Sequence, residues 1–306
     1  MKNIKSSITV YLYSTLTIIL WGLSYIWNDQ LISKGIPVEY FVFIRVFFAG
    51  SILLIFNLAM GIDIKIKKKD LSKFLLLAFC EPFIYFVCET YGIFFTESPT
   101  YSAMIIATTP IAAMFAGLIF FREKMSAMNI VGMLICIGGI VIMSETSSGI
   151  GERFLIGAIL LFIAVIAEAG QASCTKWLAG DYKPMVITMY QFLIGGVYLA
   201  PLFFTKGLSN FDPVIYLSWD VWRPIFCLAV LCSCVCFTLW VSSIKNLGVA
   251  KSSVMQAFIP VITAVSGMIL GSELLSPLQW LGILIASLGV TFSQITRNKK
   301  KGLKFL

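Results

Sequence analysis

The sequence predicts an all-α integral membrane protein in which ten transmembrane helices form two inverted five-helix repeats. Three observations lead there: an apolar composition, the spacing of apolar stretches relative to basic residues, and an internal repeat. Of the 306 residues, 59% are apolar and only 12% are charged, and the mean hydropathy is +0.92. Soluble domains carry roughly 25% charged residues. The composition therefore excludes an ordinary soluble enzyme and a disordered protein.

Ten stretches have the length, about 20 mainly apolar residues, that crosses a bilayer as a helix. We predict helices at 7–27, 37–59, 72–95, 98–120, 127–144, 154–178, 185–204, 222–245, 249–271 and 276–296. The first follows Lys2 and Lys5, as in a signal peptide, but its apolar run is too long and no small-residue cleavage site follows it. The connections are short, so the chain is predicted to form one membrane unit.

The distribution of lysine and arginine sets the orientation. With the N-terminus inside, 18 of the 23 basic residues fall in cytoplasmic segments, four fall on the opposite side, and Arg45 lies within a helix. Cytoplasmic loops of membrane proteins carry such an excess. We therefore expect a multi-pass protein of the cytoplasmic (inner) membrane with both termini in the cytoplasm. The net charge of +8 then reflects topology, with the lipid bilayer and not a nucleic acid as its partner.

The chain also repeats itself. Residues 98–140 align with 248–290 at an offset of 150, so that Pro110 falls on Pro260 and Glu123 on Glu273. Each repeat contains five helices, and because five is odd the second copy enters the membrane inverted. We assign residues 1–146 to the first repeat and 147–306 to the second, which ends in a basic cytoplasmic tail. Inverted repeats are typical of alternating-access carriers that bind substrate near the bilayer midplane.

A known family shares these features, and the residues that carry the likeness are spread along the chain. They are Trp21-Gly22-Leu23-Ser24-Tyr25, Arg45, residues 102–123 with Pro110, Gly132, Gly138 and Gly139, and residues 252–273 with Pro260. With them the sequence resembles the drug/metabolite transporter superfamily, and more narrowly its ten-helix exporters with two EamA-type domains. The resemblance covers essentially the whole chain and implies a secondary transporter, with efflux as the expected direction. It is nearly silent on substrate, because relatives move amino acids, nucleotide precursors or drugs.

Four charged residues lie within the predicted spans, where insertion of a charge costs at least about 2.5–3.5 kcal/mol. They are Arg45, Glu81, Glu89 and Glu168. At about 1.5 Å per residue, Arg45 lies about 12 Å and Glu89 about 9 Å from the outer side, which predicts an ion pair. That pair either fixes two helices together or takes part in gating and substrate binding. The three glutamates are not a general family pattern, so they point to this protein's own chemistry.

Glu168 is the first candidate for proton coupling and Glu81 the second. Glu168 lies about 21 Å from the outer side, among small residues that leave room for a substrate or permit close packing. A carboxyl group removed from water can exchange its proton near neutral pH, and the chain has no histidine to do so. The alternative for both glutamates is a packing role with hydrogen bonds.

The predicted substrate site combines aromatic rings with amide and carboxyl groups. Its candidate residues are Trp21, Tyr25, Glu89, Tyr101, Gln171, Tyr190, Gln191, Trp240 and Gln256. Pro110 and Pro260 interrupt equivalent helices and are assigned, with Arg45, a structural or gating role. Such a wall suits a small amphiphilic metabolite, although each aromatic residue can equally belong to the packed core.

Cofactors are not expected. The eight cysteines lie mostly within apolar runs without a CxxC pair, and a phosphate-binding glycine loop is missing from the sequence. We predict a secondary transporter, not an enzyme, that moves a small metabolite such as an amino acid, driven by protons or by the solute's own gradient. The alternatives are a membrane-embedded lipid-modifying enzyme and a non-transporting receptor or scaffold. Glycines of the fifth and tenth helices would permit close packing within the bundle or in a homodimer.

Overall fold

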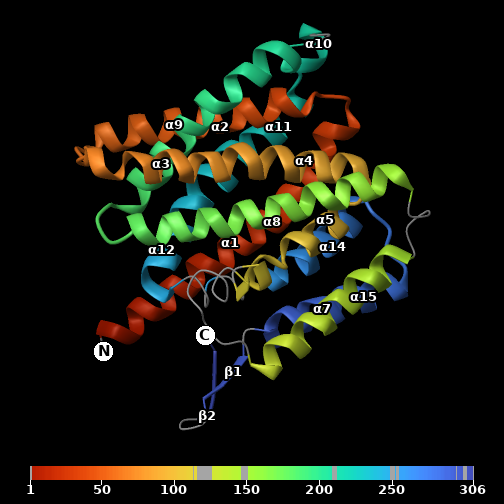
Figure 1. Cartoon of the computed structure of the whole chain (residues 1–306). Helices are drawn as coiled ribbons and strands as arrows, with labels where there is room; N and C mark the ends of the chain where they lie inside the picture. The colour runs from red at the N-terminus through yellow and green to blue at the C-terminus, as the bar shows by residue number, and fades with distance from the viewer. Residues whose placement is uncertain are drawn as a thin grey trace.

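The fold is given by a computed structural model that describes residues 2–112, 114–115, 126–145, 151–208, 212–248, 252, 255–293, 295–298 and 302–305. These residues form a bundle of helices with a short two-stranded hairpin near the C-terminus (Figure 1). Seven helical stretches of the described chain are long and apolar enough to cross a membrane: 9–33, 38–59, 68–96, 127–144, 152–178, 184–207 and 219–247. Gln256–Leu270 and Pro277–Ser293 are shorter apolar helices.

The first half of the chain supplies the helices as predicted, with small shifts at their ends. Its elements are α1 (Lys2–Ser33), α2 (Val38–Ala59), η1 (Lys68–Asp70), α3 (Leu71–Ala78), η2 (Phe79–Ile84), α4 (Tyr85–Thr96), α5 (Pro99–Ile106) and α7 (Ala127–Glu145). Helix α1 continues beyond the predicted end at residue 27 to Ser33, and Asn28 and Leu31 in this extension are fully buried. The stretch from η1 to α4 is one span with a break inside it.

The second half of the chain also consists of helices with interruptions. Its elements are α8 (Glu152–Leu178), α9 (Pro184–Leu202), η3 (Phe203–Gly207), α10 (Pro213–Tyr216), α11 (Trp219–Phe226), η4 (Cys227–Cys236), α12 (Phe237–Leu247), η5 (Gln256–Phe258), α14 (Ile259–Leu270) and α15 (Pro277–Ser293). The predicted segments 98–120 and 249–271 extend into residues outside the described ranges. The ten-helix arrangement therefore stays a prediction.

The C-terminal tail contains an element that the sequence analysis did not include. Helix α15 ends at Ser293 rather than at residue 296, and β1 (Ile295–Asn298) then pairs with antiparallel β2 (Gly302–Phe305). Ile295 lies opposite Phe305 in this hairpin. Its first strand begins with two β-branched residues, which favour extended backbone. The all-α prediction thus holds for the bundle but not for this tail.

Helices α7 and α15 cross at very short distance and lie side by side at one flank of the bundle (Figure 1). A Cβ atom on Gly132 would lie 2.2 Å from the backbone nitrogen of Ser293, and one on Gly139 would lie 2.5 Å from that of Ala286. Gly289 is equally tight, because its Cβ would lie 2.3 Å from the backbone nitrogen of Cys136. These glycines therefore serve packing within the bundle.

Gly139→Ala is expected to lower the apparent melting temperature of the purified protein, because the added methyl group meets backbone that cannot yield. Overpacking of this kind costs about 1–3 kcal/mol. Gly138→Ala is the matched control, since a Cβ on Gly138 meets no atom within 4 Å. Thermal unfolding followed by size-exclusion chromatography compares the two. Equal melting temperatures for both variants would contradict the close crossing.

A glutamate of one half caps a helix of the other. Glu273, just after α14, accepts hydrogen bonds from the Ser98 hydroxyl and from the backbone N–H and hydroxyl of Thr100 at the start of α5. A carboxylate at a helix N-terminus satisfies unpaired donors and complements the helix dipole. Glu123, the counterpart of Glu273, lies outside the described residues.

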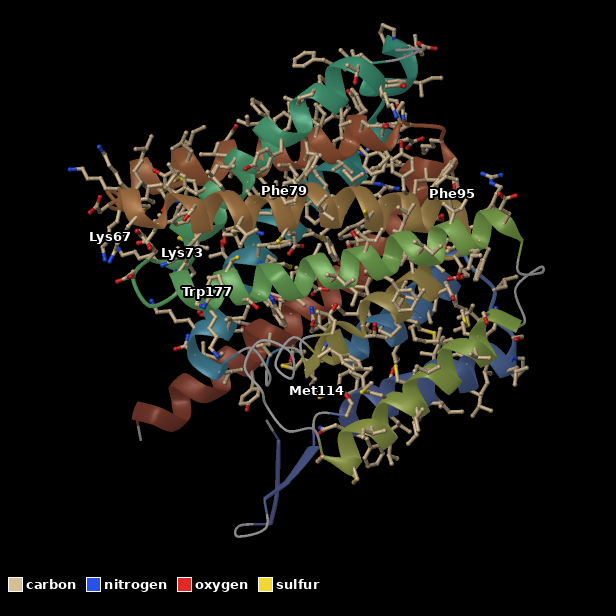
Figure 2. The ribbon with its side chains drawn as sticks, viewed as in Figure 1. Lys67, Lys73, Phe79, Phe95, Met114 and Trp177 are labelled. Atoms are coloured by element: carbon tan, nitrogen blue, oxygen red, sulfur yellow. The ribbon has the colours of Figure 1, made fainter. Side chains whose placement is uncertain are left out.

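At the opposite end a polar cluster joins the segment before α3 to the segment between α8 and α9. Figure 2 shows Lys67 at this end and Phe95 at the other. The backbone N–H of Lys67 donates to the Tyr182 hydroxyl, which in turn donates to Asp70. The Lys67 ammonium pairs with Asp181 at 3.2 Å, and this hydrogen bond raises the pKa of Lys67. The cluster ties the two halves together at this end.

Candidate functional site

The span from η1 to α4 is interrupted beside Glu81. Glu81 has an extended backbone (φ −148°, ψ 123°) within an otherwise helical segment, and Pro82 follows it. The Gln191 side-chain amide donates to the Glu81 carbonyl at 3.0 Å, so the break carries its own hydrogen bond. The proline ring fits only because position 195 is glycine: a Cβ atom at this position would lie 2.2 Å from the Pro82 ring. The break places the Glu81 side chain in the interior.

The predicted breaks at Pro110 and Pro260 are also present. Helix α5 ends at Ile106, a turn follows, and the chain resumes helical structure at Thr109. The Thr109 hydroxyl donates to the Ile106 carbonyl at 2.7 Å, which is the carbonyl that Pro110 cannot serve because proline has no N–H. Pro260 lies in the first turn of α14, where a missing N–H costs little. Both breaks lie next to the centre of the bundle.

These breaks border a cavity of about 430 Å³. Its lining residues come from both halves of the chain: Trp21, Ser24, Tyr25, Arg45, Glu81, Tyr85, Phe86, Glu89, Ile106, Glu168, Phe237, Trp240, Gln256 and Ile259. This figure includes space that is open to solvent, and the room left for water-sized molecules is only about 30 Å³, so the structure shows a nearly closed cavity. Three carboxyl groups and one guanidinium group share this space, and each belongs to a residue that is less than one-tenth exposed.

Glu168 is held by residues from two other helical segments. Its Oε2 lies 2.6 Å from the Thr109 hydroxyl, next to the break after α5. Its Oε1 accepts a hydrogen bond from the side-chain amide of Gln256, in η5. Glu168 thus bridges, from α8, the two broken helices that occupy equivalent positions in the repeats.

Arg45 does not form the predicted ion pair with Glu89. Within the described part of the chain, no carboxylate oxygen lies within 4.0 Å of Arg45. Its guanidinium instead stacks over the Phe86 ring, 3.9 Å from the centroid, and makes long hydrogen bonds of 3.4 and 3.5 Å to the Ser233 hydroxyl. Glu89 instead accepts a hydrogen bond from the Tyr85 hydroxyl, which lies 2.9 Å from its Oε1.

Two polar atoms of the cavity residues are buried without a hydrogen-bond partner among the described residues. They are Nη1 of Arg45 and Oε1 of Gln256. Aromatic rings complete the wall, and Trp21 packs edge-on against Trp240 and Phe237 at 5.2 and 5.3 Å. A buried polar atom without a partner costs free energy, and the cavity wall combines such atoms with apolar rings.

The other predicted site residues lie outside the cavity lining. Tyr101 packs on Phe154, 4.7 Å between ring centroids, and the Tyr190 hydroxyl donates to a backbone carbonyl at residue 64. Gln191 supports the break at Glu81, and Gln171 is buried on α8. Sequence reasoning missed Tyr85, Phe86 and Thr109. A threonine directly before a helix-breaking proline was the signal for the last of these.

Comparison with known proteins gives a consistent result. The model of the EamA-like transporter family matches residues 8–145 and 155–294. An uncharacterized transporter, YetK, of Bacillus subtilis is 24% identical over 276 residues, covering 89% of this chain and 82% of its own. A probable terminal-alkyne amino-acid exporter of Streptantibioticus cattleyicolor is 24% identical over 191 residues, 62% of each chain. One solved crystal structure aligns with a TM-score of 0.69 at 13% identity, over 93% of this chain and 96% of the other, which shows the shared fold.

Proposed function

We propose, from the premise that this chain belongs to the EamA-like transporter family, that it exports a small amphiphilic metabolite by alternating access. The family and the names of the relatives indicate a membrane transporter rather than an enzyme. The observation that carries the finer proposal is the central cavity, where buried carboxyl groups, an arginine and aromatic rings from both halves meet. The relative named as an amino-acid exporter supports both the direction and the cargo.

The ten-helix inverted repeat is part of this proposal. The two matched stretches of the family model support a first repeat at 1–146 and a second at 147–306. Helix contacts support it as well, because each contact has a counterpart when every helix is replaced by the corresponding helix of the other half. Helix α1 packs on α14 and on η4 and α12, and its counterpart α8 packs on α5 and on α3 and α4. The pairs α2 with α9, α5 with α14 and α7 with α15 map onto themselves under this exchange. Both termini are proposed to lie in the cytoplasm, at the inner membrane, from the basic-residue count.

The chemistry of the cavity favours a zwitterion with an apolar side chain. Nη1 of Arg45 is a donor suited to a carboxylate, and a planar guanidinium binds carboxylates with fixed geometry. The carboxyl groups of Glu81, Glu89 and Glu168 and Oε1 of Gln256 are acceptors suited to an amine. The tryptophan and phenylalanine rings then contact the apolar part. An apolar amino acid fits all three demands.

Glu168 is proposed as the proton-coupling group, with Glu81 second, since both lie on the cavity. Arg45, Pro110 and Pro260 are proposed to act in gating: Arg45 faces the cavity, and the prolines separate the short helices that meet Glu168. Trp21, Tyr25, Glu89, Trp240 and Gln256 line the binding site. We propose that four residues outside the lining hold the lining residues in position: Tyr101, Gln171, Tyr190 and Gln191.

A ligand screen tests the proposed function. The purified protein is heated with a panel of amino acids, their methyl esters, simple amines and carboxylic acids, and thermal stabilisation is recorded. Apolar amino acids are expected to stabilise the protein, because a ligand at 100 times its Kd contributes about 2.7 kcal/mol. The best ligand should also accumulate in inverted membrane vesicles when a pH gradient is imposed. Stabilisation by none of the panel, together with no vesicle uptake, would contradict the proposal.

A further inference from the structure

The hydroxyl of Thr109 is at hydrogen-bond distance from two oxygens at once. Its Oγ1 lies 2.7 Å from the carbonyl oxygen of Ile106 and 2.6 Å from Oε2 of Glu168. A hydroxyl carries one hydrogen, and a backbone carbonyl carries none. Both contacts are full hydrogen bonds at the same time only when a second hydrogen lies on Glu168. In that state Glu168 is a carboxylic acid that donates to Thr109, while Thr109 donates to Ile106.

The other carboxyl oxygen completes the chain of hydrogen bonds. Oε1 of Glu168 accepts from the Gln256 amide, as the carbonyl oxygen of an acid does. One proton thus aligns four groups in sequence: Gln256 donates to Glu168, Glu168 to Thr109, and Thr109 to Ile106. The chain joins η5, α8 and the break after α5.

Loss of the proton must rearrange this chain. An ionised Glu168 only accepts, so the Thr109 hydrogen turns toward the carboxylate, where a charge-assisted bond is stronger. The Ile106 carbonyl then loses its donor, and Pro110 has no N–H to replace it. Ile106 lines the cavity. An acceptor without a donor is unfavourable in a buried wall, and a ligand N–H can satisfy it.

We propose that Thr109 is the positioning residue that makes the proton on Glu168 and an N–H donor of the substrate mutually exclusive. With Glu168 protonated, the Ile106 carbonyl is occupied by Thr109. With Glu168 ionised, the carboxylate and the Ile106 carbonyl together accept from the substrate amine. The proton leaves for water on the side to which the cavity is open. This role of Thr109 rests on the proposed transport function, and it explains how binding of the substrate is coupled to release of the proton.

Other ionisable groups share the cavity with Glu168 and contribute to its titration. They are Tyr25 of α1, Arg45 of α2, Glu81 of η2, and Tyr85 and Glu89 of α4. None of them hydrogen-bonds to Thr109 among the described residues. A substitution at Thr109 leaves this electrostatic background in place, so its effect reports the hydroxyl alone.

Infrared titration of the purified protein tests the proposal without a transport assay. The carboxylic-acid C=O band of Glu168 is identified by its loss in Glu168→Gln and is followed across pH. In Thr109→Val the carboxylate loses its donor, so the band should disappear at a pH about one unit higher or more, a tenfold change in proton affinity. Thr109→Ser should restore the wild-type midpoint. Thr108→Val is the matched control. The Thr108 hydroxyl donates to the carbonyl of Ile105 at 2.6 Å, whereas the hydrogen bonds of Glu168 within the described residues go to Thr109 and Gln256.

Two ligands of equal charge test whether the N–H donors of the substrate amine are required. Isopentylamine carries N–H donors, whereas isopentyltrimethylammonium carries none. The first should remove the Glu168 acid band at a pH where the free protein shows it, and the second should not. Equal midpoint pH values of the acid band in Thr109→Val and Thr108→Val overturn the proposal. If Thr109→Val does not fold, the ligands decide: equal effects of the two, or no effect of either, overturn it. Should the bands behave as proposed while no substrate is transported, only the proposed function fails.

Discussion

Glu168→Gln is expected to abolish pH-driven transport and to weaken substrate binding while leaving folding intact. Glutamine reproduces the hydrogen bonds of the protonated acid, since its oxygen can accept from Gln256 and its amide can donate to Thr109. It cannot release a proton. The variant is therefore held in the hydrogen-bonding state of the protonated acid, with the Ile106 carbonyl occupied by Thr109.

Proteoliposomes with the membrane potential clamped at zero provide the measurement. If one proton exchanges for one substrate, a pH difference of one unit supports about tenfold accumulation, because that difference corresponds to 1.4 kcal/mol. Glu168→Gln should reach only equal concentrations inside and outside. Because it mimics the protonated acid, it should exchange labelled for unlabelled substrate only at higher substrate concentrations than wild type does. Glu152→Gln, on an exposed first turn of the same helix, is the control and should behave as wild type.

A Glu168→Gln variant that accumulates substrate as wild type does would remove Glu168 from the coupling role. Glu81 would then be tested in the same way, because it lies on the same cavity. If both variants retain pH-driven accumulation, the protein is a facilitator without proton coupling, and the buried carboxyl groups serve structure.

Much of the bundle follows from sequence because its determinants are local. Apolar stretches of bilayer length and the periodic breaks at proline mark the helices, and residues near the predicted ends begin or end the observed ones. The capping role of Glu273 could not be predicted, since it depends on two segments, far apart in sequence, that meet at the start of α5. The hairpin at 295–305 was missed because a short basic tail has no hydrophobic pattern to mark it.

The candidate site was predictable by residue type but not by arrangement. Charged groups within spans mark a functional region in any membrane protein, and Arg45, Glu81, Glu89 and Glu168 all line the cavity. Depth estimates along each helix placed Arg45 level with Glu89, but depth says nothing about rotation around the helix axis. In the structure the Arg45 side chain lies over the Phe86 ring instead of reaching Glu89.

Arg45→Gln is expected to remove the preference for a carboxylate in the ligand. Nη1 of Arg45 is buried without a hydrogen-bond partner among the described residues, and the guanidinium is held in place by Phe86 and Ser233. A substrate carboxylate completes this site. Losing one partner of a buried, hydrogen-bonded charge pair costs about 2–5 kcal/mol, so affinity for the amino acid should fall by at least about 30-fold.

Three ligands that share one side chain separate the contributions: L-leucine, its methyl ester and isopentylamine. Wild-type protein should bind leucine more tightly than the other two, whereas Arg45→Gln should bind all three with similar, weak affinity, measured by thermal stabilisation or calorimetry. Arg153→Gln is the matched control, because the Arg153 guanidinium also lies near aromatic rings, 5.7 Å from the centroid of Phe94, but is exposed and outside the cavity. If Arg45→Gln still distinguishes leucine from its ester by the wild-type factor, the carboxylate binds elsewhere and Arg45 acts only in holding α2 against Phe86 and Ser233.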